Sequence, residues 1–342
     1  MAENKEFETI MKDITRGLVE DSEANMKYLH EQCEKYKDHE YGKEIVRACG
    51  RLMYEIIPED KKTELDKAIG KDKMGFDATL EEIRFNIYKK DYDKALKLAE
   101  DMVHKYEKMD LFASDAVSEY FCFGEPMEEI LYSHYNEPQK DIRRAQVDYA
   151  GLYMQYGSLL VEMKRIDDAA VALEKAKKWN PANTMIAFEY TETFKIRGMM
   201  DEFAELTKDV FKYAFRPGDL ARCYRNMAYY FVEIEEYKVA VCCLLFSGQF
   251  HKSEMASSEL YYISQKMGEI YDPTHDELKE LFEKYEIPYG PDVEMLRTAY
   301  SYGMHFHEQG NEFATAYFLN IFASFINDEE VDKILGEIKG KE

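Results

Sequence analysis

Apolar residues recur every three or four positions along most of the chain, which is the period of an amphipathic helix. Two clear runs follow one another, the first with Leu80, Ile83 and Ile87 and the second with Ala95, Leu98, Ala99 and Met102. No comparable stretch shows the period of two that a half-buried strand would have. Proline and glycine fall between the runs, where they are expected to end helices. The pattern predicts an all-α chain of roughly a dozen or more helices, most of about 10 to 18 residues.

Small and large residues in the segment 150–183 follow a more specific spacing. Its marker residues are Tyr153, Tyr156, Gly157, Leu160, Ala169, Leu173 and Pro181. Gly157 and Ala169 are small where two antiparallel helices would cross, and Pro181 would end the second helix. This spacing resembles the tetratricopeptide repeat (TPR), a 34-residue helix–turn–helix unit. The segment thus predicts a helix pair that packs against similar neighbours.

The same spacing returns downstream. It is clear in residues 221–254, with Tyr224, Met227, Ala228, Phe231, Ala240 and Leu244, and in 296–329, with Ala299, Tyr302, Gly303, Phe306, Thr315 and Leu319. A weaker copy spans 184–217, and the remaining intervals leave room for degenerate units at 111–149 and 255–290. We therefore expect a TPR-like array over residues 76–330. The resemblance implies a right-handed α-α superhelix of TPR-like helix pairs.

The two ends of the chain and one internal segment depart from the repeat. Residues 1–75 have helical patterns that do not match it, and we interpret them as an N-terminal helical cap, because a terminal repeat lacks one neighbour. Residues 331–342 are expected to be a charged C-terminal tail. The segment 120–132 is compatible with a helix–turn–helix or with an extended insertion.

TPR arrays generally bind peptides or protein segments in a concave groove lined by the first helix of each unit. By resemblance, the candidate partner-binding residues are Arg222, Arg225, Asn226, Tyr229, Arg297, Tyr300 and His307. The preceding unit would contribute Phe188, Glu189, Glu192 and Lys195 to the same groove. Arginine pairs well with carboxylates, and aromatic rings supply rigid contact area. The alternative is that Arg222 and Arg225 only offset neighbouring acids and cover apolar surface.

Charge and composition narrow the class of partner. The net charge is −23, which argues against binding to nucleic acids or anionic membranes, since both carry phosphate. It favours a protein or peptide partner that is basic overall. The sequence has no long apolar run and no secretory signal at its start, and its six cysteines are scattered. We therefore expect no membrane association and a cytoplasmic location.

The common catalytic signatures are missing from the sequence, including the phosphate-binding loop, the dinucleotide fingerprint and the zinc-protease and serine-hydrolase motifs. His305 and His307 stand two apart on a predicted helix and would point in different directions. We therefore expect no metal, no cofactor and no enzymatic activity. The leading hypothesis is an interaction scaffold that binds a peptide or protein segment. Two alternatives remain: a peptide-sensing regulatory protein without its own DNA-binding domain, and an enzyme with an unrecognised helical active site near 111–149.

Overall fold

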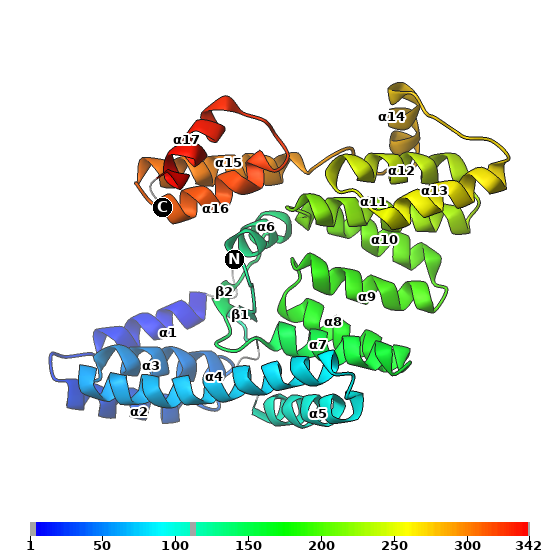
Figure 1. The fold of residues 1–342 in the computed structure, drawn as a ribbon. Coiled ribbons are helices and arrows are strands. Elements are labelled where there is room, and N and C mark those ends of the chain that lie inside the picture. Colours follow the sequence, from blue (N-terminus) through cyan, green and yellow to red (C-terminus); the bar gives the residue numbers. More distant parts are fainter. Residues whose placement is uncertain (1–4, 110–113, 341–342) are drawn as a thin grey trace. The chain divides into compact units, whose positions relative to one another are not determined.

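The computed structural model describes residues 5–109 and 114–340 of the chain, and almost all of its regular structure is helical (Figure 1). The chain forms two compact units, one of residues 1–122 and 138–159 and the other of residues 123–137 and 160–342. The predicted all-α fold of TPR-like helix pairs is confirmed.

The first compact unit contains the N-terminal helices and two short strands. Its elements are α1 (Lys5–Arg16), α2 (Ser22–Tyr36), α3 (Gly42–Ile56), α4 (Glu59–Tyr88), α5 (Tyr92–Met109), β1 (Ser118–Phe121), β2 (Asp141–Arg144) and the greater part of α7 (Tyr149–Glu162). Helices α1 to α3 share a small core around Ile14, Leu29 and Ile45, which are at most 2% exposed. Helix α4 packs against α5.

The second compact unit contains the clearest repeats. Its elements are α6 (Pro126–Asn136), α8 (Ile166–Trp179), α9 (Thr184–Ile196), α10 (Met200–Val210), the 3-10 turn η1 (Phe211–Tyr213), α11 (Pro217–Glu233), α12 (Tyr237–Phe250), α13 (Glu254–Met267), α14 (His275–Lys284), α15 (Val293–Glu308), α16 (Glu312–Ala323) and α17 (Glu329–Lys339). From α8 to α13 each helix packs against the next one along the chain (Figure 1).

The same turn joins the two helices of each repeat. One residue of the turn has a left-handed backbone, with φ between 60° and 73°, at Lys90, Lys164, Gly198, Glu235 and Gly310. The next N–H bonds to the carbonyl five residues back, as from Arg165 to Leu160 at 2.9 Å and from Glu236 to Phe231 at 2.8 Å. This is the hydrogen bond of the Schellman motif. The motif lies at the turns of α4–α5, α9–α10, α11–α12 and α15–α16, whose two helices pack against each other as repeated pairs, and at the turn before α8.

Small residues lie where the paired helices cross. Ala169, Ala204, Ala240 and Thr315, which mark the second helices, are all at most 3% exposed. In the pair α15–α16, a Cβ added to Gly303 would lie 2.4 Å from Cδ2 of Leu319 and 3.3 Å from its backbone nitrogen. Only glycine therefore permits this close approach.

Aromatic packing fixes the centre of the second unit. Tyr224 is fully buried, and its ring centroid lies 4.9 Å from that of Phe211 and 5.0 Å from that of Phe246. Its hydroxyl donates a hydrogen bond to the Pro288 carbonyl and accepts one from the Gly290 N–H, both at 2.8 Å. The tyrosine of the repeat pattern is thus both core and anchor for the connection before α15.

The segment 111–149 differs from the helix pair that the repeat spacing predicts there. The described part of it has β1 and β2 paired in parallel, with α6 between them in sequence. A parallel pair needs a crossover connection, and α6 provides it. Residues 111–113 lie outside the described residues.

Two further expectations are corrected at the ends of the array. Residues 331–342 were expected to be a charged tail, but α17 covers most of them, and it buries Val331, Ile334 and Leu335 against Leu319 of α16. The expected boundary between residues 75 and 76 falls inside the continuous helix α4. Gly70 and Gly75 lie within this helix, with open space where a Cβ would be.

Candidate functional site

Helices α9 and α11, the first helices of two consecutive pairs, share a face that α13 borders. We call it the α9–α11–α13 face. On it, the Arg222 guanidinium lies over the ring of Phe188, with Cζ 4.4 Å from the ring centroid. Nη2 of Arg222 is also 3.6 Å from Oε1 of Glu189, and both side chains are about one third exposed. Arg222 thus already has an aromatic and an acidic neighbour from α9.

Tyr229 lies about two helical turns after Arg222 on α11. The Lys195 ammonium sits 4.1 Å from its ring centroid, and Lys195 also forms an ion pair of 3.3 Å with Glu192. The Phe203 ring meets Tyr229 nearly edge-on at 6.0 Å. Burial and the nearby carboxylate of Glu233 raise the pKa of the Tyr229 hydroxyl, so it stays protonated and able to donate a hydrogen bond.

Arg225 differs from its neighbours, because its guanidinium is not fully satisfied. Nη1 of Arg225 is buried and has no hydrogen-bond partner among the described residues. Burial, followed by the positive charge of Arg222, lowers the pKa of Arg225. Glu259 of α13 is close enough to affect Arg225, and burial raises the pKa of that carboxyl. A buried donor without an acceptor is costly, and an incoming oxygen atom would relieve that cost.

Helix α13 extends this face with exposed apolar side chains. Met255 stands four residues before Glu259 and Tyr262 three residues after it, so all three share one side of the helix. Met255 is 74% exposed and Tyr262 is 49% exposed. Large apolar side chains in such positions offer contact area to a partner.

The predicted partner-binding residues fall into two groups. Arg222, Arg225 and Tyr229 belong to the α9–α11–α13 face, and Asn226 lies one turn after Arg222 on α11, partly exposed. The residues predicted from 296–329 lie instead on α15, which pairs with α16.

The three α15 residues have different surroundings. Arg297 is 66% exposed at its side chain and forms an ion pair of 2.5 Å with Glu294, one turn earlier. Tyr300 packs against Phe322 in the small core that α17 completes, with ring centroids 5.2 Å apart. His307 is exposed in the last turn of α15. Tyr300 therefore contributes to packing at the end of the array.

The sequence pattern did not identify Met255, Glu259 and Tyr262 as members of the face. Residues 255–290 lack the repeat spacing, so the spacing could not show which of them face the groove. The available signal was the alternation of acidic and large apolar residues at helical spacing in α13, next to a repeat whose first helix carries two arginines.

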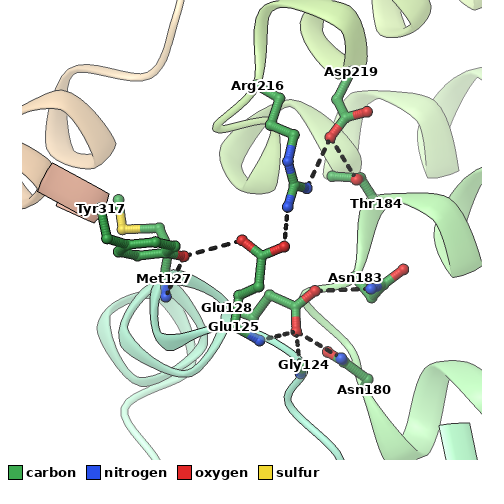
Figure 2. A network of polar contacts seen from close by, with 10 residues as sticks. All are labelled: Gly124, Glu125, Met127, Glu128, Asn180, Asn183, Thr184, Arg216, Asp219 and Tyr317. Atoms are coloured by element: carbon green, nitrogen blue, oxygen red, sulfur yellow. Dashed lines mark hydrogen bonds and ion pairs between the residues drawn. The ribbon is translucent and has the colours of Figure 1, made fainter. Parts of the chain in front are cut away.

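The acidic residues at the start of α6 belong to a separate network, shown in Figure 2. Glu128 is 3% exposed and accepts hydrogen bonds from the Gly124 N–H at 2.7 Å and from the Glu125 N–H at 3.3 Å. Its two carboxylate oxygens also accept from the side-chain amides of Asn180 and Asn183, both at 2.8 Å. Glu128 thus ties α6 to the connection between α8 and α9.

Glu125 forms the second part of this network (Figure 2). Its carboxylate pairs with Arg216, the residue before α11, and accepts a hydrogen bond of 3.1 Å from the Tyr317 hydroxyl of α16. Arg216 also lies 3.7 Å from Asp219, which accepts a hydrogen bond of 2.8 Å from Thr184. Glu125 and Glu128, which lie in the segment 111–149 near which the enzyme alternative placed an active site, are thus engaged in contacts that hold helices together.

Within residues 5–109 and 114–340, no group of three or more histidine, cysteine, aspartate or glutamate side chains has the arrangement of a metal site. In the same ranges, no helix has both the length and the apolar character needed to cross a membrane.

Comparisons with known proteins find a likeness only among solved structures. No protein-family model matches the chain, and no curated protein matches it. Among solved structures, the chain is similar to YrrB, a TPR protein described as having an unusual peptide-binding site. The sequences are 15% identical, and the match covers 63% of this chain and 98% of YrrB with a TM-score of 0.30. A likeness at this level carries no information about function, and the fold assignment rests on the repeated helix pairs themselves.

Proposed function

We propose that the protein is a non-enzymatic interaction scaffold whose α9–α11–α13 face binds an extended peptide or protein segment. The observation that carries this proposal is the buried Nη1 of Arg225, which has no acceptor among the described residues. A bound oxygen atom would satisfy this donor, and most buried donors in proteins do have an acceptor. The face would correspond to the concave groove of a TPR-like array.

The chemistry of the face defines the ligand. Arg225 and Arg222 would bind a carbonyl or carboxylate oxygen of the segment, because guanidinium groups match these acceptors. Tyr229, Met255 and Tyr262 would contact apolar side chains next to it. The net charge of −23 would attract a partner that is basic outside this contact. Asn226 is proposed to bind the ligand backbone, and Arg297 and His307 to contact a longer segment that reaches α15.

A reducing cytoplasm is the proposed location. The six cysteines are all free thiols, as such a compartment would keep them. A peptide-sensing regulatory role uses the same face and would be distinguished by a change of conformation when the segment binds.

Peptide selection followed by a matched variant pair tests the proposal. Peptides enriched from a random library on the full chain would be titrated by calorimetry against wild type, Arg225→Met and Tyr229→Ala. Loss of a charged hydrogen bond predicts about 10- to 100-fold weaker binding for Arg225→Met. Arg84→Met is the control, because it removes one arginine from the exposed surface of α4 and should leave affinity unchanged.

Two results would contradict the proposal. If no peptide is enriched on the folded chain, the face does not bind extended segments. If the enriched peptides bind Arg225→Met as tightly as wild type, the binding site lies elsewhere. Circular dichroism of each variant would establish that the helical fold is retained.

A further inference from the structure

A second group of arginines lies in the first compact unit, where β1 and β2 pair in parallel. The register places Ser118 opposite Asp141 and Tyr120 opposite Arg143. Side chains alternate between the two faces of a strand, so these four share one face of the ribbon. Nε of Arg143 donates a hydrogen bond of 2.9 Å to the hydroxyl of the buried Ser118, and its Nη2 lies 3.2 Å from Asp141. Arg143 is therefore held at two points.

Helix α3 contributes two more arginines to this face. Nη1 of Arg47 pairs with Oδ2 of Asp115 at 2.6 Å, and Cζ of Arg47 lies 5.5 Å from the ring centroid of Tyr120. Asp115 is fixed in turn by the backbone N–H of Ser118 at 2.7 Å. Arg51 follows Arg47 by four residues, so both side chains lie on the same side of α3.

Arg51 is the member of this group without a resident acceptor. Among the described residues it makes no hydrogen bond and no ion pair. Desolvation lowers the pKa of Arg51, and the charge of Arg143 lowers it further. Attraction to Tyr120, Asp115 and Asp141 offsets part of the repulsion between Arg51 and Arg143, and the two acids are already paired with Arg47 and Arg143. The buried Glu44 of α3 is a third carboxylate in this region, but it already accepts a hydrogen bond of 2.7 Å from the Ala116 N–H, so the exposed Arg51 side chain has no acceptor of its own.

We propose that Arg47, Arg51 and Arg143 form a binding site for a phosphate monoester, as carried by a phosphorylated residue of a partner protein. Arginine forks bind phosphate oxygens in a bidentate manner, and a phosphate group has three terminal oxygens with which to contact more than one guanidinium. The resident carboxylates would position Arg47 and Arg143 before the ligand arrives. Tyr120 would pack against the group that carries the phosphate. The proposal is independent of the α9–α11–α13 face, since every residue in it belongs to the other compact unit.

The test uses small probes and the full chain. Phenyl phosphate, inorganic phosphate and benzoate would each be titrated and followed by phosphorus or proton NMR. The expected order of affinity is phenyl phosphate first, with inorganic phosphate and benzoate clearly weaker. Arg51→Gln should weaken phenyl phosphate binding by about 10- to 100-fold, and Arg51→Lys by less. Arg84→Gln should bind as wild type, because that arginine lies on α4 and pairs with Glu81.

Each other outcome would overturn the inference. Equal affinity for benzoate would define a carboxylate site, and equal affinity for inorganic phosphate would remove the role of an ester. Unchanged binding in Arg51→Gln would place the ligand elsewhere, and no binding of phenyl phosphate to wild type would exclude the site. Arg51 makes no hydrogen bond or ion pair among the described residues, so circular dichroism of Arg51→Gln should match wild type.

Discussion

Arg225 and Glu259 show how burial sets the properties of single side chains on the α9–α11–α13 face. Each charge is partly removed from water, and neither forms an ion pair with the other within 4.0 Å in the described structure. Burial disfavours the charged form of both groups, so the pKa of the arginine falls and that of the glutamate rises. This destabilisation of the unliganded face is the expected cost of a site that keeps donors available for a partner.

Glu259→Gln should therefore raise the free energy of unfolding at pH 7. Because the pKa of Glu259 is higher in the folded state than the unfolded value of about 4.3, the native state binds its proton more tightly. Stability from this group is complete below the unfolded pKa and is lost as pH rises through the folded pKa. The gain of the variant over wild type should thus be present at pH 7 and vanish near pH 4. Urea unfolding at both pH values measures the difference.

Glu277 supplies the matched control of opposite sign. Hydrogen bonds from the Thr274 backbone and hydroxyl lower the pKa of Glu277, so its stabilisation is present at neutral pH and is lost as pH falls. Glu277→Gln should lower the free energy of unfolding at pH 7. Shifts of the same sign in the two variants would contradict the assignment of burial as the dominant effect at Glu259.

At the scale of elements, the repeated turn is the feature that makes the helix pairs alike. Its left-handed position is glycine in α9–α10 and α15–α16, but lysine in α4–α5 and α7–α8 and glutamate in α11–α12. A residue with a Cβ pays about 1–2 kcal/mol in this conformation, and glycine avoids most of that strain. The turn thus has unequal backbone strain in different repeats.

Glu235→Gly should stabilise the protein by about 0.5–1 kcal/mol. The change removes the backbone strain at the α11–α12 turn, but glycine also gives the unfolded chain more conformational freedom, and this cancels part of the gain. Gly310→Ala is the reverse change in α15–α16. No atom lies within 4 Å of the added Cβ there, so its expected loss of about 1 kcal/mol comes from the backbone alone. Denaturant unfolding of both variants measures the effect. A loss of stability in Glu235→Gly would show that the side chain has a role that outweighs the strain.

The sequence was sufficient to predict the repeats whose packing depends on spacing. Ala169, Ala240 and Gly303 are small because two helices cross at them. A small residue at a fixed position of the repeat can be recognised in the sequence alone. For the same reason, Arg222, Arg225 and Tyr229 could be placed on the face that Glu189 and Lys195 also line. These positions depend only on helical period and on the order of the repeats.

Elements that depend on distant partners could not be predicted in this way. The strands β1 and β2 are four residues each and are paired across the intervening α6, which no local period reveals. Helix α17 has many charged residues, and only its packing on α16 distinguishes it from a solvated tail. The contribution of Glu259 depends on how α13 packs against α12 and brings this carboxyl near Arg225, a property of the tertiary structure.

At the scale of the whole molecule, the net charge of −23 opposes folding through repulsion between like charges. Many exposed ion pairs act in the other direction, such as Lys178 with Glu174 at 3.0 Å and Lys37 with Glu34 at 2.9 Å. Pairs of this exposed kind contribute little to stability and are themselves weakened by salt. The effect of salt on stability therefore shows which of the two opposing contributions is larger.

We expect salt to stabilise the protein, because repulsion acts over longer distances than the paired contacts. The screening length is about 30 Å at 10 mM ionic strength and about 8 Å at 150 mM, so the added salt removes repulsion between distant acids while close pairs keep most of their attraction. The midpoint temperature of unfolding, measured by circular dichroism at pH 7, should rise between 10 mM and 150 mM sodium chloride. Sucrose at matched osmolarity, which does not screen charge, controls for solvent exclusion. A lower midpoint in salt would mean that the ion pairs outweigh the net charge, and the attraction expected for a basic partner would then have to come from local acidic groups instead of the whole chain.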